Sequence, residues 1–354
     1  MTDESTTRPV SRPVKQSAIQ QLVEVLRRWN IQAQQWLLCD QHALYGAAFA
    51  RIASGLSVIG ILLTNFRWRD LIFGPGASWA QVLPNREYWP ALLIAHLGET
   101  SFLVVYLLTI AMAVGWTLGW HAKIVGLFML IGHVAMMQRT PFVGDQGDNA
   151  LRLGLYLLLL MNVTEVWALD ARRRSNASTN GRFLTKLWRS QPVLPRWIAN
   201  AIHNVAVALL AFQLTLIYIS AGMYKTQGAY WQNGTALYYP LSLPEFRPIP
   251  ELTNLLLHAD IMVGVVTYVV VFTQLFFPVM LIVSVATRRI AIALVMLFHL
   301  SIAIVMALPW FSLELLALDS IFISTMTYQY LERWIRQRGQ DLRVLFKRRP
   351  SATA

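Results

Sequence analysis

A single lysine at the end of a long apolar segment is the residue of this 354-residue chain with the most scope for chemistry. Lys225 follows the small residues Ala221 and Gly222 and precedes an aromatic, amide-rich stretch that ends at Tyr239. An ionisable group at the edge of an apolar span is costly to keep without a partner or a task. Lys225 is therefore a candidate base, and the alternative interpretation is an anchor at the membrane interface.

Other ionisable side chains also lie in or beside apolar segments, and we expect them in the outer half of the molecule. Charged groups at such depths usually face a cavity or one another. They predict a partly hydrated cavity that opens outward, although Asp148 could simply cap a helix and His299 could be a packing residue. We expect His299 to hydrogen-bond to Glu314 or Asp319. The groups are Glu99, His133, Asp148, Lys225, His299, Glu314 and Asp319.

The composition predicts an integral membrane protein. Hydrophobic residues make up 56% of the chain and charged residues only 14%, whereas soluble domains carry about a quarter charged residues. The net charge of +12 comes from basic residues in loops and tails, which argues against nucleic-acid binding. The one cysteine, Cys39, excludes an intrachain disulfide and a cysteine-based metal site, and the histidine spacing predicts no metal site.

The elements that would position these residues are transmembrane helices, each of about 20 apolar residues. The fold class that we predict is all-α, a polytopic membrane helix bundle with about eight spans. The expected spans are 44–66, 91–116, 122–138, 148–168, 201–224, 261–286, 290–308 and 311–330.

The distribution of basic residues sets the expected orientation. Cytoplasmic loops carry an excess of Lys and Arg, and with eight spans most of these residues lie on one side, with both termini. Lys225 then faces outward, and we expect Arg51 to extend toward the interface. The basic residues on the outer side are Arg67, Arg69, Arg86, Arg139, Arg152, Lys225 and Arg247.

Three parts follow from this division. Residues 1–43 form a basic cytoplasmic segment, which is either an amphipathic surface helix or a disordered tail. Residues 44–330 form the transmembrane domain, and residues 331–354 form a basic cytoplasmic tail. Ile19, Leu22 and Leu26 recur at helical spacing, which favours the surface helix.

The chain resembles the HTTM domain family, the membrane domain shared with vitamin K-dependent gamma-carboxylases, whose bacterial members include the sporulation-delaying protein B type. The resemblance is strongest at Ala221-Gly222-Met223-Tyr224-Lys225, followed by Trp231, Gly234 and Tyr238-Tyr239. A second match is Phe298-His299-Leu300, followed by Trp310-Phe311. Weaker matches extend the resemblance over about residues 42–330.

The resemblance implies a site for a reduced naphthoquinone of the vitamin K or menaquinol type. In the carboxylases a neutral lysine deprotonates this quinol, and oxygen then turns it into a base strong enough to remove a glutamate γ-proton before carbon dioxide adds. By resemblance, Lys225 is the base and His299 and Asn149 are its orienting or proton-handling partners. Tyr218, Trp231 and Tyr238 are the expected quinone-binding residues, and membrane lipid and a secreted peptide are the expected partners.

Two departures from the carboxylases bear on activity. Asn149 stands where they carry a histidine, and an amide cannot shuttle protons near neutral pH. After the last expected span we also expect only a basic cytoplasmic tail, and not their large extracytoplasmic domain. The resemblance therefore leaves two functions open, both in the bacterial inner membrane: quinol-dependent modification of a secreted peptide, or a non-enzymatic role in its maturation, export or immunity. A transporter is disfavoured because no internal repeat is evident.

Overall fold

The computed structural model describes residues 18–77, 89–140, 143–175, 183–188, 190–191 and 193–347. Within these residues all regular structure is helical. The first seventeen residues of the predicted N-terminal segment, residues 348–354 of the predicted tail, and Arg86 of the predicted outer side lie outside this description.

Five helices are long and apolar enough to cross a membrane. They are α2 (Leu44–Thr64), α5 (Glu99–Leu118), α10 (Arg196–Thr226), α14 (Asp260–Val283) and α15 (Val285–Val305). A sixth span is possible where α16 (Pro309–Asp319) and the 3-10 turn η4 (Ser320–Phe322) precede α17 (Thr325–Lys347). The membrane class of the protein follows from these helices.

Two of the eight expected spans are interrupted or bent, and a third, at α7 (Gln146–Leu160), is shorter than expected. Residues 89–118 divide into α4 (Trp89–Ala95) and α5, and Gly98 is the extended N-cap of α5. The span expected at 311–330 bends by 113° before α17. The bend follows from local hydrogen bonds, because Ser324 Oγ accepts from the backbone N–H of Thr327 and so starts a new helix.

Helices α6 (Ala122–Arg139) and α7 (Gln146–Leu160) occupy the other two expected spans. Helix α7 has only 15 residues because Met161 is extended, so residues 161–168 do not continue it as the sequence predicts. These two helices are not among the five that satisfy both length and apolarity. The number of eight spans and the cytoplasmic termini stay predictions.

Small residues let the central helix α2 pack closely against its neighbours. Helix α2 contacts both α5 and α16. A Cβ atom on Gly55 would lie 2.2 Å from Thr117 Oγ1, and one on Gly60 would lie 2.3 Å from the Trp310 ring. In lipid no hydrophobic driving force brings helices together, so close packing must stabilise their contacts. Small residues allow this packing because they let the helix backbones approach closely. The packing then continues from α10 to α14, α14 to α15 and α15 to α16.

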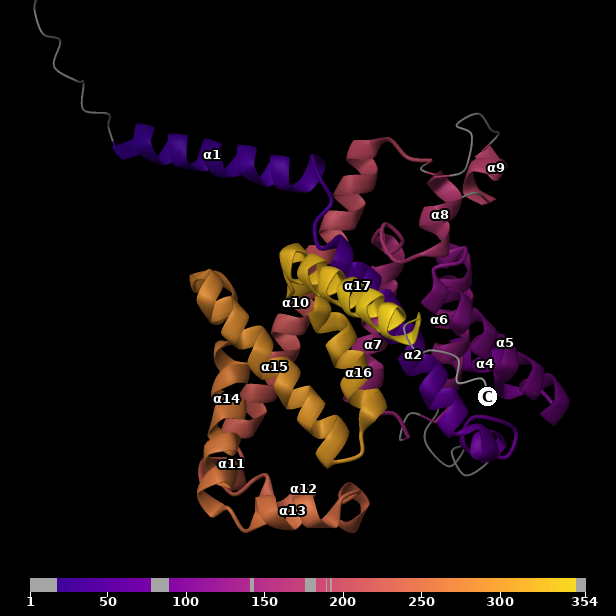
Figure 1. Cartoon of the computed structure of the whole chain (residues 1–354), viewed down its shortest axis with the longest axis vertical. Helices are drawn as coiled ribbons and strands as arrows, with labels where there is room; N and C mark the ends of the chain where they lie inside the picture. The colour runs from indigo at the N-terminus through magenta and orange to yellow at the C-terminus, as the bar shows by residue number, and fades with distance from the viewer. Residues whose placement is uncertain are drawn as a thin grey trace, which may run out of the picture.

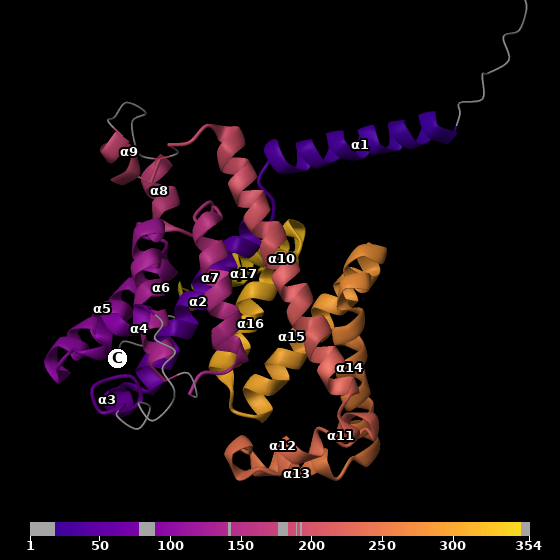
Figure 2. The same cartoon turned by 180° about the vertical axis from the view of Figure 1, so that it is seen from behind.

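Helix α1 and several short helices lie at opposite ends of the bundle (Figures 1 and 2). One end holds α1 (Ala18–Leu38), α8 (Leu169–Ser175) and α9 (Phe183–Trp188). The other end holds α11 (Ala229–Gln232), α12 (Tyr238–Ser242) and α13 (Pro250–Leu257), which follow Lys225. The basic segment 172–174 and Lys225 therefore lie at opposite ends.

Helix α1 extends away from the bundle (Figure 1), and its apolar side chains are uncovered. Ile19, Leu22 and Trp29 are more than half exposed. The two alternatives for this segment are a surface helix and a disordered tail, and residues 18–38 form a helix. Its attachment to a membrane surface stays a prediction.

Arg51 does not extend toward the interface as the sequence predicts. Its side chain is completely buried, and the guanidinium donates to the backbone carbonyls of Trp116, Thr117, Val163 and Trp167. The Trp116 and Thr117 carbonyls belong to the last turn of α5, and the other two belong to the segment between α7 and α8. A guanidinium has five donors and can satisfy several carbonyls at once. Arg51 thereby joins the end of α5 and the segment between α7 and α8 to helix α2.

Candidate functional site

Three buried polar side chains from different helices meet in the core. Tyr218 of α10 donates from its hydroxyl to Asp319 Oδ2 of α16 at 2.6 Å. The same hydroxyl oxygen lies 3.3 Å from Nε2 of His299 in α15. All three side chains are 2% exposed. The Phe277 ring of α14 covers Tyr218 at 4.6 Å between ring centroids.

The hydrogen bonds in this cluster fix the tautomer of His299. Because Tyr218 donates to Asp319, Nε2 of His299 must donate to the tyrosine oxygen. The other ring nitrogen, Nδ1, is then an acceptor, and it has no partner among the described residues. Asp319 Oδ1 also lacks a partner there. The cluster therefore presents two buried acceptors to a ligand or water.

The expected bond from His299 to Glu314 or Asp319 is wrong in detail, because Tyr218 stands between His299 and Asp319. Glu314 instead accepts from Ser57 Oγ of α2 at 3.3 Å. Its other oxygen lies against Gly147, where a Cβ atom would be only 2.4 Å away. The two acidic residues of α16 thus face different neighbours, which helical spacing alone does not reveal.

A second acidic group lies at the start of α7. Asp145 caps the helix by accepting from the N–H groups of Gly147 and Asp148, and the Asp148 side chain accepts from the Asp145 N–H. This capping box confirms the structural alternative for Asp148. Partial burial and the neighbouring Asp148 raise the pKa of Asp145. Both carboxylates also act electrostatically on Glu314.

Lys225 ends α10 seven residues after Tyr218, and its side chain is half-buried. Its ammonium lies 3.5 Å from the Ala221 carbonyl oxygen and 5.1 Å from the centroid of the Trp231 ring. Lys225 forms no ion pair with any carboxylate of the described residues.

The expected quinone-binding residues do not form one group. Trp231 contacts Lys225, and Tyr218 belongs to the buried cluster. Tyr238 borders a separate hollow of about 220 Å³ beside Gly234 and Asp260. Its ring and that of Tyr239 lie nearly at right angles, 6.0 Å apart. The structure therefore places Trp231 and Tyr238 near the end of α10 and Tyr218 deeper in the bundle.

Asn149 is not joined to the Tyr218 cluster by a hydrogen bond. Its side chain is exposed, and its Oδ1 accepts from Arg152 on the same helix at 2.7 Å. Gly147, two residues earlier, is the position of α7 that contacts Glu314. No group of three or more His, Cys, Asp or Glu side chains in the described ranges is arranged to hold a metal ion.

Sequence comparison adds a family to this geometry. The model of the HTTM domain family matches residues 48–326, which include Asn149, Lys225 and His299. The sporulation-delaying protein SdpB of Bacillus subtilis (strain 168) is 26% identical to the chain over 260 residues, which cover 72% of this chain and 73% of that protein. No solved structure matches the chain.

Proposed function

Because the chain belongs to the HTTM domain family, we propose that it is a bacterial inner-membrane protein that carries out quinol-dependent modification of a secreted peptide. Helices α6 and α7 would complete eight spans, with both termini in the cytoplasm. Two features support this orientation. The basic segment of α8 and the end of α10 lie at opposite ends of the bundle, and Lys and Arg are favoured on the cytoplasmic side.

The observation that carries the proposal is the environment of Lys225. The amine is half-buried and has no carboxylate partner among the described residues, although the Trp231 ring and the Ala221 carbonyl beside it favour its charged form. Desolvation without a counter-ion favours the neutral form of a lysine. A neutral Lys225 can accept a proton from the hydroxyl of a bound aromatic alcohol.

The residues around Lys225 fit a reduced naphthoquinone. Trp231 offers an aromatic face, and the nearby hollow is bordered by Tyr238 and Tyr239. When bound, a reduced naphthoquinone would supply, together with oxygen, the driving force for removing a glutamate γ-proton before carbon dioxide adds. Lys225 would take the proton of the quinol hydroxyl. His299, which contacts Tyr218 through Nε2, would offer its unpartnered Nδ1 as a hydrogen-bond acceptor.

The proposal is tested with inverted and right-side-out membrane vesicles that contain the full chain, a reduced naphthoquinone and isotopically labelled bicarbonate. Peptides secreted by the same cells serve as substrates, and mass spectrometry detects a gain of one carbon dioxide. We expect modification with the native protein and none with Lys225→Arg, which keeps the charge but does not supply a neutral base. Lys186→Arg is the matched control and should retain activity. Modification that persists in Lys225→Arg would contradict the proposal.

A second candidate function has an observation of its own. Asn149 binds Arg152 and cannot carry protons, so the proton-handling partner implied by the carboxylases is missing. This favours a non-enzymatic protein for maturation, export or immunity of a secreted peptide. A chain that protects or exports such a peptide equally well as native protein and as Lys225→Arg would support this function over the enzymatic one.

A further inference from the structure

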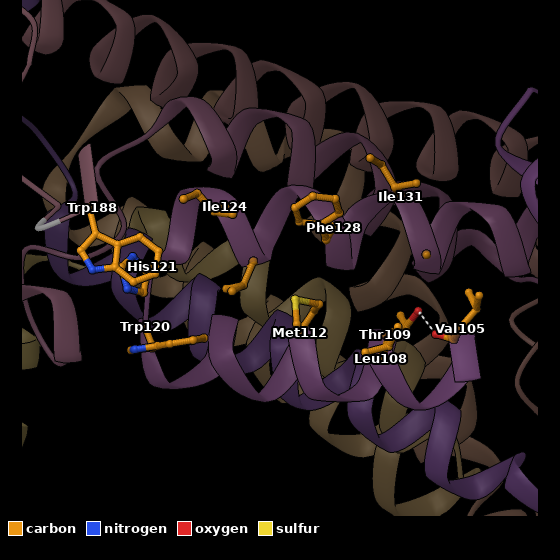
Figure 3. Close-up of a pocket in the computed structure, with 12 residues that line it drawn as sticks. Val105, Leu108, Thr109, Met112, Trp120, His121, Ile124, Phe128, Ile131 and Trp188 are labelled. Carbon is orange, nitrogen blue, oxygen red and sulfur yellow. Dashed lines mark hydrogen bonds between the residues drawn. The ribbon is translucent and has the colours of Figure 1, made fainter. Parts of the chain in front are cut away.

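An apolar groove runs between α5 and α6, away from the Tyr218 cluster (Figure 3). Its volume is about 470 Å³. Side chains of α5 form one wall and side chains of α6 form the other, as the close-up shows. The wall residues on α5 are Val105, Leu108 and Met112, and those on α6 are Ile124, Phe128 and Ile131.

The groove faces outward from the bundle. Leu108 is 54% exposed and Phe128 is 57% exposed, although both are apolar. Because α5 is one of the helices suited to cross a membrane, the medium that meets these side chains is lipid. The groove is therefore open to the bilayer and not to water.

Close contact between the two helices forms the floor. A Cβ atom on Gly132 of α6 would lie 2.3 Å from Thr109 Oγ1 of α5. Thr109 directs its hydroxyl to the Val105 carbonyl of its own helix at 2.8 Å, so the floor offers no free donor. The larger side chains on either side then stand above the floor. The result is a groove with apolar walls whose floor offers no free hydrogen-bond donor.

Polar and aromatic groups mark one end only. Trp120, His121 and Trp188 border this end (Figure 3). Arg173 of α8 adjoins this end, because its guanidinium is 2.6 Å from His121 Nε2 and 3.0 Å from the Trp188 carbonyl oxygen, and it also pairs with Asp170 at 3.4 Å. The Arg173 side chain remains 29% exposed and belongs to the consecutive arginines 172–174. Tryptophans and arginines are the residues that meet lipid headgroups.

The dimensions agree with one membrane leaflet. From Val105 to the turn at Trp120, α5 rises about 20 Å at roughly 1.5 Å per residue. The hydrocarbon part of one leaflet is about 15 Å thick, which is half of the bilayer core. A lipid tail that starts beside Trp120 and spans one leaflet would therefore cover about ten residues of α5 and end between Met112 and Leu108.

We propose that this groove binds one acyl chain of an anionic phospholipid whose headgroup lies against Arg173 and the tryptophans. The apolar walls match the chain, and the arginine at the single polar end matches a phosphate. A neutral lipid fits the walls equally well, so the arginine selects the headgroup charge. Binding a lipid here would hold α5 and α6 together on the side that the rest of the bundle does not cover.

The test uses the full chain in nanodiscs with phosphatidylglycerol that carries a photoactivatable group in its acyl chain. After illumination, mass spectrometry maps the labelled residues. We expect labels concentrated at the groove positions Leu108, Met112 and Phe128. Phosphatidylcholine with the same chain should label them about fivefold less, which corresponds to the attraction of one arginine near an anionic lipid.

Two matched variants separate a binding groove from general contact with lipid. Leu108→Trp fills the groove from an exposed position, and Leu216→Trp adds the same bulk on exposed α10 outside it. Only Leu108→Trp should lose the label, and both variants should remain folded. Labels spread evenly over the lipid-facing helices, equal labelling by both lipids, or insensitivity to Leu108→Trp would each overturn the proposal. Displacement of the probe by a small mole fraction of an isoprenoid naphthoquinone would instead assign the groove to a quinone tail and overturn it as well.

Discussion

The hydroxyl of Tyr218 is 2.6 Å from Asp319 Oδ2, and this hydrogen bond joins α10 to α16 inside the bundle. The same oxygen meets His299 of α15. The helix that carries Lys225 is thus joined through one phenol to the two polar residues of the helices opposite. Removing the Tyr218 hydroxyl alone would break both of these contacts while the aromatic ring keeps its place.

Tyr218→Phe should destabilise the protein because Asp319 and His299 both lose a partner while they stay buried. An unsatisfied buried group costs roughly 1–3 kcal/mol. Thermal unfolding in detergent measures the effect. Asp319→Asn is the comparison, because an amide oxygen can still accept from Tyr218. A Tyr218→Phe protein as stable as the native one would show that water or another group replaces the phenol.

Arg51→Met should be among the most destabilising substitutions in α2. The substitution removes the donor of hydrogen bonds to four backbone carbonyls, two at the end of α5 and two between α7 and α8. Each hydrogen bond from a charged donor contributes about 1.5–3 kcal/mol. Arg51→Lys should give an intermediate loss, since an ammonium cannot reach all four carbonyls. Limited proteolysis between α7 and α8 would report the loosened segment. Equal stability of Arg51→Met and native protein would contradict the role assigned to this residue.

The pH dependence of stability should reflect His121, the N-cap of α6. Burial and the neighbouring Arg173 lower its pKa from the ordinary value of 6.5. The unfolded chain therefore binds this proton more readily than the folded chain. Stability should be full above about pH 6.5 and decline as the pH falls below it.

His121→Phe should flatten this decline between neutral and mildly acidic pH, as measured by thermal midpoints in detergent. A native slope retained in His121→Phe would show that another group titrates.

How far the sequence predicts the structure depends on the distance between interacting residues. The uncharged stretch expected at 261–286 appears as α14, because apolar length is a local property. The partners of Arg51 are 65–116 residues away in the chain, so no local pattern reveals them. Likewise, periodicity predicts that Tyr218 and Lys225 lie on one helix. It does not predict the rotation of that helix, which directs Tyr218 to Asp319.

The candidate site shows the same division. Lys225 and His299 are recognisable from their motifs, and their helices α10 and α15 meet where Tyr218 contacts His299. Asn149 occupies the expected helix start, yet it binds Arg152. Asp170 escapes sequence reasoning entirely, although it caps α6 by accepting from the N–H groups of His121 and Ala122. Its only sequence signal is an acidic residue before three arginines.

The orientation can be tested with the native cysteine. Cys39 is exposed between α1 and α2, on the side expected to be cytoplasmic. In right-side-out vesicles an impermeant thiol reagent should spare it. With Cys39→Ser and a new cysteine at the exposed position Gln232, the same reagent should label the protein. The opposite pattern would reverse the orientation and place Lys225 inside.

The reactivity of Lys225 tests the central claim most directly. In the purified full chain near neutral pH, a small amine reagent should modify Lys225 faster than Lys186, because an unpaired, desolvated amine is held neutral. Reduced naphthoquinone should protect Lys225 and leave Lys186 unaffected. Reactivity of Lys225 equal to or slower than that of Lys186, with no protection by the quinol, would contradict the account and identify Lys225 as an interfacial anchor.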